Sequence, residues 1–169
     1  MKKAIMFIMA AGLCSGIFAK NLVKNGDFET NVNWDAPKSA PHFSYVEEDA
    51  RSGKRCMKVL KHAYQGGIKL QKGKSYKLTV SVKCKDVPKD GFCVKILKFE
   101  NGKPAGWVNT QGVYQLVRSG GTHDWKKLSG VIPAKMIGEG VNGCIFVAKD
   151  KKGGEVFVDD LSLELLPEK

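Results

Sequence analysis

Motifs that carry catalysis, or that bind metals and nucleotides, are missing from this sequence of 169 residues. It has three histidines, and none belongs to a His-Glu-x-x-His motif. No serine stands in Gly-x-Ser-x-Gly, and no two cysteines form a Cys-x-x-Cys pair. The segment Gly67–Ser75 resembles a phosphate-binding loop, but five residues separate its glycines instead of four and no helical pattern follows. These absences argue against a metalloprotease, a serine hydrolase, a zinc domain and a nucleotide-binding enzyme.

Long apolar runs are missing as well. The run Ala4–Ala11 is far shorter than the ~20 residues that span a bilayer. It follows Lys2 and Lys3 and precedes Ile17–Ala19, which is the order of a secretory signal peptide with cleavage after the alanine. Two alternatives stay open: a membrane anchor, and lipid attachment at Cys14, although the residue before that cysteine is larger than a lipoprotein signal requires.

The domain organisation follows from the same segment. We predict a signal peptide in residues 1–19 and one exported domain in residues 20–169, because the remainder shows no repeat, low-complexity tract or linker. The protein is then secreted or held in the periplasm or cell envelope, without a membrane span. The sequence does not indicate an oligomeric state.

Acidic residues are few. The chain has 17 of them against 28 lysines and arginines, a net charge of +11, which falls to +9 when Lys2 and Lys3 leave with the signal peptide. The segment Lys69–Lys98 holds nine lysines and two aspartates. Two interpretations remain open: a field that attracts polyanions, and a solvated strand face that protects sheet edges. Nucleic acid is disfavoured as the polyanion, because the chain is exported and has no recognisable nucleic-acid-binding signature.

Four cysteines remain after the predicted cleavage, and an even number in an oxidising compartment allows three disulfide pairings. Cys84 and Cys93 flank the turn signal Lys89–Gly91. A hairpin bridged by a Cys84–Cys93 disulfide is therefore predicted, and so short a loop gains about 2–3 kcal/mol from it. The alternative is that all four cysteines are small buried hydrophobic residues.

Period-two alternation dominates the sequence. From Tyr76 to Lys85, apolar side chains alternate with lysine, threonine and serine, as in a strand with one face in water. Glycine, proline or asparagine separates most of the strand-like runs, and no window has a helical stripe. The pattern predicts an all-β sandwich or barrel. Its further β-rich runs are His42–Glu47, Arg55–Lys61, Phe92–Phe99, Val113–Val117, Trp125–Ile132, Cys144–Ala148 and Glu155–Leu165.

Five stretches in sequence order resemble carbohydrate-binding modules of the galactose-binding-like jelly-roll group, families four, nine, sixteen and twenty-two. The resemblance covers nearly all of the predicted domain. It implies a two-layer β-sandwich jelly roll, with the first and last strands side by side and a non-catalytic sugar-binding function. The stretches are Asn21–Glu29, Arg51–Val59, Leu70–Val82, Asp124–Gly130 and Val156–Leu165.

The resemblance also implies a structural calcium ion that ties the first strand to the last. Several oxygen ligands suit such a hard cation. The alternative gives Glu29 and Asp160 to hydrogen bonds or ion pairs with the nearby Arg51 and Lys54. The ligand positions that the resemblance assigns are Asp27 or Glu29, the loop Ala50–Lys54 including Ser52, and Asp159 or Asp160.

A sugar site needs aromatic rings, because a pyranose presents an apolar face that such a ring covers. Tyr76 belongs to an apolar strand face, and Trp34 and Trp125 are assigned to packing. Tyr64, just after the third strand, and Trp107, in the loop Gly102–Val108, are the candidate stacking residues, with loop packing as the alternative for each. Tyr114 and Arg118 follow in the next strand as further candidates, again with packing as the alternative. Polar or cationic contacts are assigned to Lys98, Gln115, Arg118 and Lys149.

Lysine is more abundant here, and aromatic residues fewer, than in typical neutral-glucan binders. This departure favours an anionic glycan, such as a uronate-rich, sulfated or sialylated chain, as the partner. Two alternatives from other classes remain: a secreted surface protein that uses the same fold to bind a protein or envelope polymer, and a polysaccharide lyase or hydrolase. For a lyase, the acid and base would come from Tyr64, His62 and Lys98.

Overall fold

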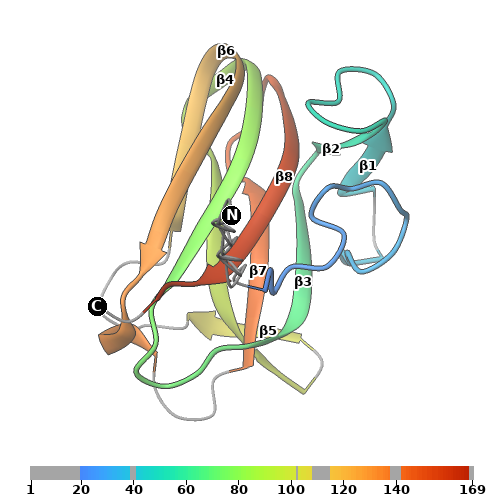
Figure 1. Ribbon diagram of the computed structural model, residues 1–169. Coiled ribbons are helices and arrows are strands. Elements are labelled where there is room, and N and C mark those ends of the chain that lie inside the picture. Colours follow the sequence, from blue (N-terminus) through green and yellow to red (C-terminus); the bar gives the residue numbers. More distant parts are fainter. Residues whose placement is uncertain (1–19, 39–40, 102, 108–114, 138–141, 168–169) are drawn as a thin grey trace, which may run out of the picture.

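The computed structural model describes residues 20–38, 41–101, 103–107, 115–137 and 142–167, and these residues are mostly β-strands (Figure 1). The predicted signal peptide and Tyr114 lie outside the described residues. Among those described, no helix is long and apolar enough to cross a membrane. The elements are β1 (Phe43–Val46), β2 (Cys56–Val59), β3 (His62–Lys69), β4 (Tyr76–Glu100), β5 (Lys103–Trp107), β6 (Gln115–Ile132), the 3₁₀ turn η1 (Ala134–Met136), β7 (Asn142–Lys149) and β8 (Glu155–Leu165).

The strands form two layers that share β4 and β6. Residues 76–85 of β4 pair with β8 on one side and with residues 123–132 of β6 on the other, and the order continues from β8 through β2 to β1. Residues 92–98 of β4 pair with β7, and β7 pairs with β3. The first part of β6 and β5 also pair with this half of β4. The predicted two-layer β-sandwich is confirmed (Figure 1).

The strand β4 passes from one layer to the other through a bend at residues 86–91. Asp86 and Asp90 have φ angles of 54° and 56°, and such left-handed conformations increase the local bend. Gly120 of β6 lies against the bend, where a Cβ atom would collide with the carbonyl oxygen of Pro88. Aspartate and glycine therefore mark a bend within one long strand, although the same residues commonly mark a hairpin turn.

The predicted hairpin and its disulfide are wrong. Because β4 continues through the bend, Cys84 pairs with His123 and Cys93 with Arg118, and the two cysteines do not face each other. Both are free thiols, as are Cys56 and Cys144, and all four are buried. Burial raises the pKa of Cys93 to about 12, so it behaves as a small hydrophobic residue, which is the alternative that the sequence left open.

The core lies between the layers and consists of every second residue of the long strands. In the first layer, Leu78, Val80 and Val82 of β4 are fully buried. In the second layer, Val94 of β4 and Val147 of β7 are fully buried as well. Side chains of this size contribute roughly 1.5–3 kcal/mol each when removed from water, so the alternation fixes which face of each strand turns inward.

The N-terminal segment lies beside the last strand, as the resemblance implies. The backbone N–H of Leu22 donates to the carbonyl oxygen of Leu163, and that of Leu161 donates to Gly26, both at 2.8 Å. Gly26 is needed there, because a Cβ atom would collide with the carbonyl oxygen of Leu161. The segment is not a regular strand, since Asn25 has a φ of 48°.

Candidate functional site

The face of β3, β7 and residues 92–98 of β4 that points away from the core carries the candidate binding residues; we call it the outer face. Strand register aligns its residues in three rows, because facing residues of paired strands lie on the same side of a sheet. The rows are His62, Ala148, Cys93 and Arg118; Tyr64, Phe146 and Lys95; and Cys144 and Leu97.

Two of the predicted ligand-binding residues, Tyr64 and Arg118, lie on the outer face. Tyr64 is half-buried and lies within β3, not after a strand as predicted. Trp107 ends strand β5, where the sequence analysis expects a loop, and its register position faces Leu97. Arg118 is exposed beside Cys93. Lys98 is exposed at the end of the same half of β4 but falls one residue out of phase with Leu97.

Phe146 is a member of this face that the sequence analysis does not identify. It pairs with Tyr64 on one side and with Lys95 on the other, so it occupies the middle strand of the face. Its ring stacks on that of His62, with centroids 5.0 Å apart and an interplanar angle of 24°. The alternation of β7 carries the signal: Ile145 and Val147 face the core, which leaves Phe146 on the opposite side.

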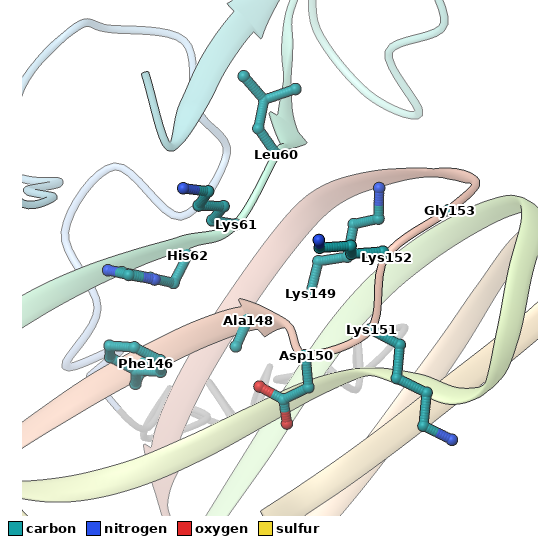
Figure 2. Close-up of a pocket in the computed structure, with 10 residues that line it drawn as sticks. All are labelled: Leu60, Lys61, His62, Phe146, Ala148, Lys149, Asp150, Lys151, Lys152 and Gly153. Atoms are coloured by element: carbon teal, nitrogen blue, oxygen red, sulfur yellow. The ribbon is translucent and has the colours of Figure 1, made fainter. Parts of the chain in front are cut away.

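A pocket with a volume of about 550 Å³ opens at one end of the outer face (Figure 2). Its floor is formed by His62, Phe146 and Ala148, and its walls come from the turn between β2 and β3 and the loop between β7 and β8. Four of the lining residues are lysines and one is an aspartate. The complete lining is Leu60, Lys61, His62, Phe146, Ala148, Lys149, Asp150, Lys151, Lys152 and Gly153.

The single carboxylate of the pocket is already neutralised. Asp150 accepts a hydrogen bond at 2.8 Å from the ammonium of Lys95, and the thiol of Cys93 lies 3.2 Å from the same oxygen. Burial acts to raise the pKa of Asp150, but these two donors outweigh it and hold the pKa below its ordinary value. The lysines at the rim therefore set the sign of the local potential, which is positive.

His62 presents a neutral aromatic ring at the pocket floor. Burial, together with the neighbouring His42 and Lys61, holds its pKa below the ordinary value for histidine. The rings of His42 and His62 have centroids 4.2 Å apart. His42 is 6% exposed, and neither of its ring nitrogens has a hydrogen-bond partner among the described residues. His42 therefore packs against His62, which in turn stacks on Phe146.

The carboxylates assigned to calcium hold the loop 50–55 by hydrogen bonds. One oxygen of Glu29 accepts backbone N–H groups from Lys54 at 2.8 Å and Arg55 at 2.9 Å. These donors, Arg55 first, hold the pKa of Glu29 below its ordinary value. The guanidinium of Arg55 also donates to the carbonyl oxygen of Glu29. Gly53, with a φ of 61°, lies directly beneath this carboxylate and leaves no room for a Cβ atom.

The carboxylates of the last strand, which were also assigned to calcium, accept hydrogen bonds from the same loop. Asp159 is fully buried and accepts backbone N–H groups from Arg51 at 2.9 Å and Ser52 at 3.0 Å. Asp160 accepts from the Ser52 hydroxyl at 2.6 Å and the Arg51 guanidinium at 3.2 Å. Asp27 is exposed.

The described residues therefore do not fit a calcium ion. The loop turns N–H groups toward the carboxylates, whereas a calcium ion needs oxygen ligands around it. Two arginines add positive charge where the cation would lie, as in the alternative that the sequence left open. No group of three or more histidine, cysteine, aspartate or glutamate side chains suited to a metal occurs in the described part of the chain.

We expect the melting temperature of the purified protein to be the same in excess EDTA and in millimolar calcium chloride, because the loop already has its donors. A structural calcium at about 100 times its Kd would add about 2.7 kcal/mol to the free energy of unfolding. Differential scanning calorimetry makes the comparison. A clear rise of the melting temperature with calcium, absent with magnesium, would show that the protein binds a structural calcium ion.

Solved structures with a similar fold include carbohydrate-binding modules and a cyclase. The CBM22-1 xylan-binding domain of Xyn10C from Paenibacillus barcinonensis aligns with a TM-score of 0.63 and 13% identity, over 89% of this chain and 97% of that one. A family 16 carbohydrate binding module aligns at 0.60 and 22%, over 85% and 99%. The Stig cyclase Fisc from Fischerella sp. TAU aligns at 0.56 and 15%, over 87% and 97%. At these identities the likeness shows the fold alone.

The fold is a two-layer β-sandwich of the jelly-roll type. The chain belongs to the family described as Carbohydrate binding domain (CBM_4_9), whose model matches residues 20–142. No curated protein sequence matches it.

Proposed function

We propose that the chain is an exported, non-catalytic module that binds a poly- or oligosaccharide on the outer face. The observation that carries the proposal is the pair Tyr64–Phe146, in which register places two aromatic residues side by side on adjacent strands. Directly facing side chains of neighbouring strands have Cβ atoms about 4.5–5.5 Å apart. Such a pair offers a pyranose ring an apolar platform.

The ligand that we propose is anionic. Arg118 lies on the same face, in the row that contains His62. The pocket with its four lysines lies at the end of this face. The net charge of +9 after the predicted cleavage acts in the same direction, because it draws a polyanion to the surface and speeds association at low salt. Stacking supplies the specificity for a sugar ring, and the cations supply the preference for its charged substituents.

A glycan array probed at two salt concentrations tests both parts of this proposal. We expect uronate-rich or sulfated glycans to bind at low salt and to lose much of their signal near 0.5 M salt, where the Debye length is only about 4–5 Å. Retained weak binding to a neutral relative of the best ligand would show the contribution of stacking. Failure of every glycan to bind at either salt concentration would contradict the proposed function.

A hydrolase is the second candidate, because one hydroxyl lies next to a base. The hydroxyl of Ser119 is 2.7 Å from Nε2 of His123, and Nδ1 of that ring is 2.8 Å from the carbonyl oxygen of Asp124, a geometry that favours a base at Nε2. Both side chains line a second pocket near the bend of β4. Incubation with acidic polysaccharides separates the candidates: new reducing or unsaturated ends appear only if the protein is an enzyme.

A further inference from the structure

We propose that the pocket between the β2–β3 turn and the β7–β8 loop is a subsite for one anionic sugar residue, whose carboxylate or sulfate group lies against the rim lysines. The proposal rests on the function proposed above and assigns the charge preference to a defined part of the outer face. In this proposal the sugar ring lies over the ring pair of Phe146 and His62, and the negative group faces Lys61 and Lys152. Figure 2 shows these four side chains around the pocket.

The floor of the pocket is suited to a sugar ring. Phe146 and His62 form a nearly parallel stack, and Ala148 beside them is small enough to leave the space above it open. His62 stays neutral near pH 7, because its pKa lies below the ordinary value of 6.5. The floor is therefore apolar, while the rim is charged. Tyr64 follows His62 on the same face of β3, so a chain bound across Tyr64 reaches the pocket directly.

The rim lysines differ in what holds them. Lys149 donates to the carbonyl oxygen of Gly154 at 2.6 Å, and Lys151 donates to that of Lys89 at the same distance. Figure 2 shows Lys151 directed away from the other lysines. Lys61 and Lys152 are exposed and enter no ion pair with any residue that the structure describes. These two ammonium groups are the ones available to a ligand.

Nothing in the pocket opposes an anion. The carboxylate of Asp150 is bound by Lys95 and Cys93, and the neighbouring lysines leave a positive balance. The other side of the sandwich is different. There Lys77 and Lys127 line a polar groove together with Asp160 and Glu164, so lysine and acidic charges balance. This difference in charge between the two sites indicates that the pocket is the better place for an anion.

The test is the double variant Lys61→Gln/Lys152→Gln, with Lys77→Gln/Lys127→Gln as a control that removes the same charge from the opposite face. Isothermal titration calorimetry measures binding of three probes: an oligogalacturonate, its neutral methyl ester, and a sulfated galactan oligosaccharide. The first variant should lose about tenfold in affinity for the better of the two anionic probes, since two partly exposed ion pairs are removed. Its affinity for the methyl ester should be unchanged, as should all affinities of the control variant.

The three probes separate the outcomes. A loss for oligogalacturonate alone identifies a carboxylate subsite, and a loss for the sulfated probe alone identifies a sulfate subsite. Equal losses in both double variants would overturn the subsite, because the effect would then come from net charge. Unchanged binding in the pocket variant would also overturn it while leaving the proposed function standing. If none of the probes binds the native protein and no array glycan does, the proposed function itself fails.

Discussion

Tyr64→Ala is expected to weaken binding of the best array ligand about 30-fold, equivalent to about 2 kcal/mol, without unfolding the domain. The loss combines the apolar area that the ring covers with the geometric preference of stacked rings. The fold should tolerate the change, because the side chain lies on the outer face and the backbone of Tyr64 keeps its two hydrogen bonds to Asp35, each 2.9 Å long. Titration calorimetry gives the affinity, and circular dichroism gives the melting temperature.

The matched control is Tyr64→Phe, which keeps the ring and removes only the hydroxyl group. It should bind within a few-fold of the native protein if stacking dominates, a difference of roughly 1 kcal/mol for one hydrogen bond. Phe146→Ala should reproduce the loss seen in Tyr64→Ala, and Trp107→Ala is expected to abolish binding. If Tyr64→Ala and Trp107→Ala both retain full binding to a ligand that the array has identified, the glycan does not use this face.

Asp159→Asn is expected to lower the free energy of unfolding by about 3 kcal/mol, because a fully buried carboxylate that accepts three backbone N–H groups is replaced by an amide. Whichever way the amide turns, its NH₂ group faces backbone donors. Burial raises the pKa of Asp159, while the N–H donors of Ser52, Asp160 and Arg51 act to lower it. In a chain of this size the change corresponds to a melting temperature lower by roughly 6–12 °C.

The neighbouring Asp160→Asn makes the same chemical change at a partly exposed position. Its ion pair with Arg51 has side chains 39% and 35% exposed, and such pairs contribute about 0–1 kcal/mol. Asparagine also tolerates the left-handed backbone at this position, where φ is 48°. Urea denaturation of both variants gives the two free energies. Equal losses in the two variants would mean that the buried carboxylate does not anchor the loop 50–55.

The sequence predicts the strand content well, because alternation along β4 and β8 is a local property of the chain. The run Glu155–Leu165 coincides with β8, and Tyr76 lies in the core as its position in the alternation predicts. The path of the chain is harder to predict. Aspartate and glycine at residues 86–91 suit both a hairpin turn and a bend within a strand, and only the pairing of β4 with β6 and β7 distinguishes them.

Part of the candidate site could also be predicted from the sequence. Tyr64 and Arg118 are singled out as aromatic and cationic residues, and the register brings them to one face. Phe146 is missed because a phenylalanine among apolar neighbours is usually assigned to the core. Its exposure depends on which side of β7 turns outward, and that depends on the opposing layer.

The calcium assignment shows what a sequence motif does not predict. Motif positions correctly place Glu29 and Asp160 near the loop 50–55, but a motif does not say whether that loop turns carbonyl or N–H groups toward them. In the structure the N–H groups of Lys54 and Arg55 point toward Glu29, and those of Arg51 and Ser52 point toward Asp159.

The sequence by itself determines that this protein is a β-sandwich, and its motifs identify the family, because both depend on residue type and order along the chain. The tertiary structure decides where β4 crosses between layers, which rings face outward and which donors meet the buried carboxylates. Those features depend on contacts between residues as far apart as Arg51 and Asp159, and no local pattern encodes their relative orientation.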